Sequence, residues 1–326
     1  MKIMSPFAST DEVQPLVEAG AGELYCGVVP GDWAEKFTYT GSVNLRHDRA
    51  ANLSSFEELQ ASAKIALKCN VPVFAAFNAH FYSKHQIPLI LEQVDKAISS
   101  GASGLIIADP ALLRAAAGKF PEAKISLSTA QPCFNSHSIQ FFKGLGAKRI
   151  VLPRHLSAAE AASLAKSACS HGIETEAFAL NSICPFIDGL CTFQHMVEPS
   201  QSLEVQPLAC RLNYHVSAIG AAPESEKQIA CSHVKLWSNA LSYDCGLCAI
   251  PLFLRSGVSS VKIAGRANPL EKKLQDISAV KRAISLAKKL SAADFVEEAT
   301  ALYFSLYRRS CQCINCYCPD AGKWSR

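Results

Sequence analysis

Short apolar runs alternate with longer stretches of helical periodicity along the chain. Eight such runs occur, at residues 2–7, 23–28, 72–79, 104–110, 124–130, 149–154, 174–180 and 260–266. Each run is apolar enough to be buried on both faces, which is typical of a parallel sheet covered by helices. We therefore expect eight β-strands, each followed by a helix.

The segments between these runs carry signals for the starts and ends of helices. A serine precedes a glutamate by three residues at Ser9, Ser54 and Ser157, which predicts capping boxes. Glycines that should end helices in a left-handed conformation follow the periodic stretches, at Gly20, Gly101, Gly146, Gly172 and Gly257. Eight such units favour a TIM-like (β/α)8 barrel, for which about 250 residues is typical. An open doubly wound sheet is the alternative.

The extra length of the 326-residue chain falls in three places. They are the loop 29–53, a cysteine-rich insertion after the seventh strand within residues 181–248, and a tail after about residue 290. We expect a barrel over 1–290 that includes the insertion, followed by a C-terminal helix and cysteine-rich tail over 291–326. The loop is long enough to cover the site, or it packs against the side of the barrel.

Composition adds one strong indication of chemistry. The chain has 14 cysteines, many for a reducing compartment, so we expect some of them to be metal ligands. No apolar run approaches the roughly 20 residues of a membrane-spanning helix, and Asp11 and Glu12 interrupt any leader. These features predict a cytoplasmic protein without a membrane partner. The net charge of +4 is too small to predict nucleic-acid binding and fits an anionic small ligand equally well.

Six of the cysteines fall in the insertion, namely Cys184, Cys191, Cys210, Cys231, Cys245 and Cys248. Four thiolates can hold an iron–sulfur cluster or a tetrahedral zinc ion, and spacing does not choose between them. The alternative is that these residues are buried apolar thiols. A second group, Cys311, Cys313, Cys316 and Cys318, is either another metal site or a variable tail.

Several motifs of the chain resemble the peptidase U32 family. These collagenase-like proteins include oxygen-independent hydroxylases of ubiquinone precursors, transfer RNA and ribosomal RNA. The resemblance covers most of the chain and rests on residues 19–27, 77–82, 151–157, 181–193, 209–214 and 257–266. It implies a 4Fe-4S cluster with Cys184, Cys191, Cys210 and Cys245 as ligands. Cys248, one helical turn beyond Cys245, is a possible substitute for it.

The sequence departs from the pattern of this family in three places. His155 stands where an arginine–glutamate pair is often seen, Ala264 replaces a glutamate, and Asn181-Ser182 replaces a frequent histidine–glycine. These departures bear on the usual substrate of the hydroxylation.

Polar residues at the carboxyl ends of the strands mark the expected active site, because barrel enzymes place their sites there. The residues expected there are Cys26, Asn78, His80, Asp109, Ser128, Thr129, Arg154, His155, Asn181, Lys262 and Arg266. Of these, Asn78, His80, Asp109, Arg154, Asn181 and Arg266 are the catalytic candidates. We expect Arg154 and Arg266 to bind carboxylates of an anionic substrate or oxygen donor through forked hydrogen bonds. The alternative is an internal ion pair, for which Asp109 is a candidate partner. His80 and His155 could move protons.

The resemblance implies oxygen-independent hydroxylation, or a related oxygen or sulfur transfer. Related hydroxylases use prephenate as the oxygen source, which a site with two arginines would suit. One alternative is a peptidase, although the sequence has no HExxH and no GxSxG motif. Another is a cluster-bearing subunit that acts with a partner of the same family. We expect a small or peptide-derived substrate rather than a nucleic acid.

Overall fold

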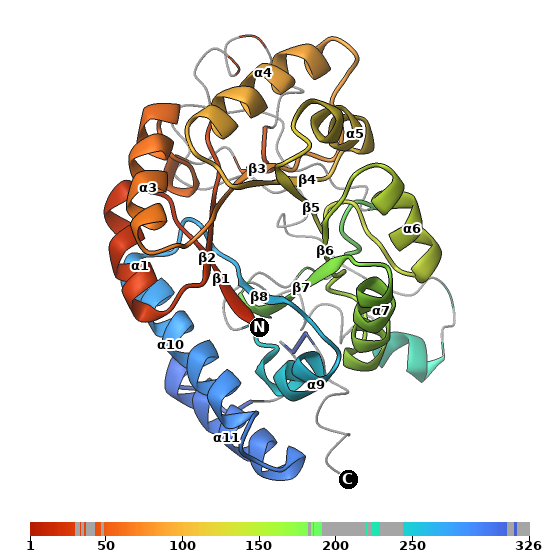
Figure 1. Cartoon of the computed structure of the whole chain (residues 1–326). Helices are drawn as coiled ribbons and strands as arrows, with labels where there is room; N and C mark the ends of the chain where they lie inside the picture. Colours follow the sequence, from red (N-terminus) through yellow and green to blue (C-terminus); the bar gives the residue numbers. More distant parts are fainter. Residues whose placement is uncertain are drawn as a thin grey trace.

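Eight parallel strands close into a barrel in the computed structural model of the chain (Figure 1). They are β1 (Lys2–Pro6), β2 (Glu23–Cys26), β3 (Val73–Phe77), β4 (Gly104–Ile107), β5 (Lys124–Leu127), β6 (Arg149–Val151), β7 (Glu174–Leu180) and β8 (Ser260–Ile263). Strand β1 pairs with β8, with Ile3 beside Val261. This pairing confirms the barrel and excludes the open sheet.

A ring of helices surrounds the barrel (Figure 1). They are α1 (Val13–Ala19), α3 (Phe56–Lys68), α4 (Gln86–Ser99), α5 (Pro110–Lys119), α6 (Ser136–Gly144), α7 (Ala158–Ser170), α9 (Ile250–Arg255), α10 (Leu270–Leu286) and α11 (Ala292–Tyr307). Helix α11, expected from the tail, packs beside α10. The structure describes residues 1–29, 33, 36, 43–46, 49–181, 184, 186–190, 220, 223–228, 244–311 and 316–317. Within these ranges, no helix has the length and apolar character needed to cross a bilayer.

Local signals for the helices were predicted with mixed success. Ser157 forms the expected capping box with Glu160. The cap of α3 is Ser55 rather than Ser54, and the side chain of Ser9 caps nothing. All five glycines expected to end helices have positive φ, namely Gly20, Gly101, Gly146, Gly172 and Gly257. The sequence therefore predicts the left-handed turns at helix ends more reliably than it predicts the serine caps.

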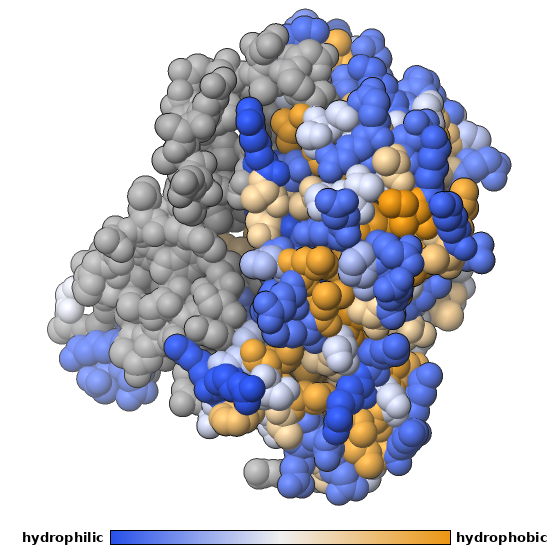
Figure 2. Space-filling model, turned by 90° about the vertical axis from the view of Figure 1, so that its left-hand side faces the viewer, coloured by the Kyte–Doolittle hydropathy of each residue, from blue (hydrophilic) through white to orange (hydrophobic). Residues whose placement is uncertain are grey.

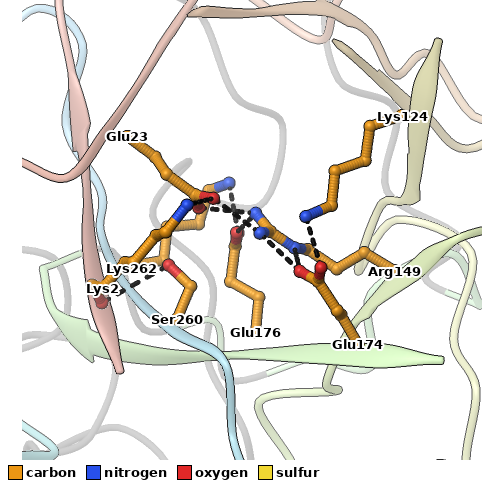
Figure 3. A network of polar contacts seen from close by, with 8 residues as sticks. All are labelled: Lys2, Glu23, Lys124, Arg149, Glu174, Glu176, Ser260 and Lys262. Carbon is orange, nitrogen blue, oxygen red and sulfur yellow. Dashed lines mark hydrogen bonds and ion pairs between the residues drawn. The ribbon is translucent and has the colours of Figure 1, made fainter. Parts of the chain in front are cut away.

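Buried ion pairs close the amino-terminal end of the barrel (Figure 3). Arg149, 1% exposed, donates to both carboxylate oxygens of Glu23 at 2.7 Å, and also to Glu174 at 2.8 Å and Glu176 at 3.2 Å. Burial alone would raise the pKa of Glu23, but Arg149 holds it below its ordinary value. The buried carboxylates are therefore compensated by a cationic partner. We call this group, Arg149 with Glu23, Glu174 and Glu176, the ion-pair floor of the barrel.

The surface of the described residues is mixed in character. On the face in Figure 2, hydrophilic side chains predominate, and apolar residues are scattered among them in small groups. Such scatter is normal for a protein surface and marks no docking site.

Candidate active site

A cavity of about 240 Å³ lies where the carboxyl ends of the strands converge. Strands β2, β7 and β8 and the loops after β3, β5, β6 and β8 all contribute to its walls. Its polar and charged lining residues include Asn44, Arg46, Asn78, His80, Ser128, Thr129, Arg154, Asp188, Lys262 and Arg266. The site is therefore at the end of the barrel opposite the ion-pair floor, as expected for this fold.

Arg154 lines the cavity and is already paired with a carboxylate. Its Nε donates to Asp188 Oδ2 at 2.8 Å, and its Nη2 donates to Asp188 Oδ1. Thr129 donates to the same carboxylate at 3.2 Å. Burial alone would raise the pKa of Asp188, but Arg154 holds it below its ordinary value. The internal ion pair that we considered therefore exists, with Asp188 rather than Asp109 as its partner.

Arg266 differs from Arg154 because its partners are neutral. It is 7% exposed and donates to Asn44 Oδ1 at 2.9 Å, to the Asn44 carbonyl at 3.2 Å and to Asn52 Oδ1 at 3.3 Å. Burial lowers its pKa to about 10. No carboxylate in the described part of the chain pairs with it. A buried cation of this kind is costly unless an anion compensates it.

The contacts of Arg266 also place the long loop. Asn44 and Asn52 come from the expected 29–53 loop, and Asn44 Nδ2 donates to Asn52 Oδ1 at 2.8 Å. Asn44, Leu45 and Arg46 line the cavity. The described part of this loop therefore forms a wall of the site.

Asn78 and His80 lie at the cavity as expected. Asn78 Nδ2 donates to Ser128 Oγ at 3.3 Å, and its Oδ1 is buried without a hydrogen-bond partner among the described residues. Burial lowers the pKa of His80, although Asp188 opposes this effect. At neutral pH His80 is therefore mainly neutral and able to accept a proton.

Two predicted site residues do not line the cavity. Asp109 caps α5, because its two oxygens accept from Leu112 N at 2.7 Å and Tyr82 N at 2.9 Å. Asn181 has a positive φ of 65° and donates to Asp276 Oδ2 at 2.8 Å, toward α10. The structure thus brings together Asn78, His80, Arg154 and Arg266, and gives Asp109 and Asn181 structural contacts instead.

The sequence places Lys262 at the mouth of the barrel without assigning it a role, and it does not predict Asp188 as a site residue. Lys262 Nζ donates to Glu176 at 2.7 Å and lies 4.2 Å from the Tyr25 ring centroid, which links the cavity to the ion-pair floor (Figure 3). Lys262 lies on β8 in the segment that resembles the family. Asp188 lies in residues 181–193, another segment that resembles the family, and this position is the only sequence signal for it that we find.

Two of the four expected cluster ligands are described, and both lie at the carboxyl end of β7. Cys184 contributes its carbonyl to a hydrogen bond with His155 Nε2 at 3.1 Å. Cys245 is buried and bridges Leu180. This shared location fits a thiolate centre beside the cavity. Cys191, Cys210 and Cys231 lie outside the described residues, and within the described ranges no three metal-ligating side chains already surround one point.

Comparisons with known proteins identify relatives of this chain. The chain is 24% identical over 277 residues to tRNA hydroxylation protein P1 of Bacillus subtilis, covering 81% of this chain and 58% of that protein. It is 28% identical over 191 residues to tRNA hydroxylation protein P of Helicobacter pylori strain 26695, covering 59% of this chain and 42% of the relative. The chain therefore spans about half the length of these curated relatives.

Among solved structures, the U32 peptidase Mk0906 matches with a TM-score of 0.42 and 15% identity, covering 55% of this chain and 69% of that chain. The model of peptidase family U32 matches residues 8–313. Because this match extends over nearly the whole sequence, the chain belongs to peptidase family U32.

Proposed function

We propose that this chain is a hydroxylation-type enzyme whose barrel cavity binds an anionic small molecule. The observation that carries the proposal is Arg266, a buried cation that faces the cavity with neutral partners. Arg46 and Lys262 add positive charge to the same lining. The names of the relatives favour a hydroxylation-type reaction.

Within this cavity the side chains divide into distinct roles. Arg266 binds a carboxylate of the ligand through its forked guanidinium, because its asparagine partners leave its charge uncompensated. Arg154, the other predicted carboxylate ligand, is already neutralised by Asp188 and therefore orients the ligand more than it attracts it. The free Oδ1 of Asn78 accepts a hydrogen bond from the ligand, and neutral His80 accepts a proton.

The proposal includes a 4Fe-4S cluster held by Cys184, Cys191, Cys210 and Cys245, with Cys248 as the substitute for Cys245. When bound, such a cluster supplies one-electron redox chemistry. The placement of Cys184 and Cys245 at the end of β7 supports this assignment. The carbonyl contact from His155 would hold the Cys184 loop in place. We propose an oxygen donor with carboxylate groups as the anionic ligand.

The acceptor of the oxygen or sulfur atom is proposed to be small or peptide-derived. A transfer RNA is the second candidate, and the names of the curated relatives favour it. Peptidase activity has less support. The cavity hydroxyls of Ser128 and Thr129 contact Asn78 and Asp188, so neither is activated by a histidine in the described structure. If the chain requires a partner subunit of the same family, activity would appear only when the chain is mixed with that partner.

Anaerobic purification, iron and sulfide analysis and Mössbauer spectroscopy test the cluster. Calorimetric titration with malonate, a simple dicarboxylate, tests the cavity. We expect malonate to bind the wild-type chain and to lose most of its affinity for Arg266→Gln. Arg282→Gln, at an exposed arginine on α10, is the matched control and should bind normally. Equal binding by all three proteins would reject the anion site.

The two acceptor candidates are separated in cells that lack the gene. Mass spectrometry of their transfer RNA would show a missing hydroxyl or sulfur group if RNA is the acceptor. Unchanged RNA, with a metabolite or peptide that differs by one oxygen or sulfur atom, supports the small acceptor.

A further inference from the structure

The C-terminal segment lies directly against the candidate site. Cys316 pairs with Cys245 in an isolated parallel bridge, and Tyr317 N donates to the Cys245 carbonyl at 3.0 Å. Tyr317 is 5% exposed. Both residues come after residue 313, where the match to the family model ends. A segment outside the matched part of the chain is therefore built into this end of the barrel.

Aromatic and polar contacts fix this segment to the cavity wall. The Tyr317 hydroxyl donates to the Asn181 carbonyl, and its ring stacks on Phe178 with centroids 5.9 Å apart. Phe178 lines the cavity, and the Arg154 guanidinium lies 5.1 Å from its ring centroid. The position of Cys316 is thus set by a buried neighbour that is itself packed against the site.

The bridge determines the direction of the two thiols. Directly paired residues of parallel strands project to the same side of the ladder, so Cys245 and Cys316 face the same way. Cys245 is buried, and Cys248, Cys311 and Cys316 are partly buried. None of these thiols forms a disulfide. Thiols from the insertion and from the tail therefore meet at the Cys245–Cys316 bridge.

We propose that Cys316 belongs to the metal centre and that it, rather than the Cys248 considered above, replaces Cys245 as a ligand of that centre. This inference rests on the proposed 4Fe-4S cluster and names a ligand from the tail. Thiolates are the preferred ligands of iron–sulfur clusters. Two thiols on the same side of one bridge can reach the same iron. Each iron of a cluster needs only one thiolate ligand, so either thiol could serve. Cys245 and Cys316 would then be alternative ligands of the same metal centre.

The test uses the full chain, purified without air, and measures iron and sulfide content, the electron paramagnetic resonance spectrum and the reduction potential. Cys245→Ala and Cys316→Ala should each retain nearly full iron. The double variant should lose most of it. Cys245→Ala combined with Cys248→Ala should keep its cluster, because Cys316 remains. Cys133→Ala, at a buried cysteine that follows β5, is the control for loss of a buried thiol.

A second variant guards against simple misfolding of the double alanine protein. In the Cys245→Ala background, Cys316→Ser keeps the side-chain size and offers oxygen in place of sulfur, so the spectrum and the potential should both shift. Iron content and spectrum that do not change with Cys316 in that background would overturn the inference. So would loss of the cluster only when Cys248 is removed. Failure of the proposed cluster itself is distinct, because the wild-type chain would then contain no iron.

Discussion

Gly27 lies directly beneath the guanidinium of Arg266. A Cβ atom placed on Gly27 would stand 1.9 Å from Arg266 Nη1 and 2.3 Å from Asn52 Oδ1. Only a residue without a side chain allows this approach, so Gly27 is part of the anion site although it carries no functional group. It lies within the AGAGELYCG segment that resembles the family.

Gly27→Ala should therefore displace Arg266 from its asparagine partners. We expect the affinity for malonate to fall by about tenfold or more, which is about 1.4 kcal/mol. Calorimetry measures the affinity, and thermal unfolding measures any loss of stability. Gly118→Ala is the control, because nothing lies within 4 Å of that Cβ on α5. The control should gain up to about 1 kcal/mol of stability. Full malonate affinity in Gly27→Ala would show that the position of Arg266 is not critical.

Arg149→Met should destabilise the protein without touching the cavity. It leaves Glu23 and Glu176, each 1% exposed, without their arginine, and breaking a buried pair costs about 3–5 kcal/mol. Urea unfolding gives the free energy, and iron content should be unchanged in protein that remains folded. Lys2→Met removes a 55% exposed partner of the same Glu23 and should cost less than about 1 kcal/mol. Equal losses in the two variants would contradict the proposed importance of the ion-pair floor.

The barrel could be predicted from the sequence because its signals are local. Eight apolar runs, the glycines with positive φ and the Ser157 cap each depend on residues close together in the chain. Most strands end before the apolar run does, because the run continues into the loop that carries the site. The Ser54 prediction missed the cap by one residue, as adjacent serines offer the same hydroxyl.

The site could be predicted only in part, because its contacts join distant segments. Arg154 meets Asp188 across 34 residues, and Arg266 meets Asn44 across 222. The spacing of these residues in the sequence predicts neither contact. The cap formed by Asp109 has a local signal, since an aspartate before Pro110 is a typical helix start. The roles of the cysteines stay predictions, because Cys191 and Cys210 lie outside the described residues.

Cys191→Ala should abolish stoichiometric iron in protein purified without air. Cys184→Ala and Cys210→Ala should do the same, because the proposal gives none of these three thiolates a substitute, unlike Cys245. Iron and sulfide analysis with Mössbauer spectroscopy is the measurement. Cys69→Ala, at an exposed cysteine after α3, is the control and should keep full iron. A full cluster in Cys191→Ala would reject the ligand assignment, and zinc in place of iron would reject the redox chemistry.

The ion pair of Arg154 with Asp188 should stabilise the folded chain. Asp188→Asn leaves the largely enclosed Arg154 side chain, 12% exposed, without its carboxylate, so the folded state should lose about 3–5 kcal/mol at neutral pH. Asp95→Asn, which removes a half-exposed pair with Lys119, should cost less than about 1 kcal/mol. Urea unfolding of the three proteins gives these free energies.

The pH dependence of the same pair separates its charge from its shape. The pKa of Asp188 is lower in the folded chain than its ordinary value, so the unfolded chain takes up the proton first as the pH falls. The stability from this pair is fully present above the ordinary aspartate pKa and is lost as the pH falls through the lowered folded value. Glu23 and Glu174 titrate in the same direction, because arginine and lysine partners lower their pKa as well. The informative quantity is therefore the difference between the wild-type and Asp188→Asn curves. We expect that difference to shrink as the pH falls, and a difference that stays constant would mean that Asp188 acts through packing rather than through its charge.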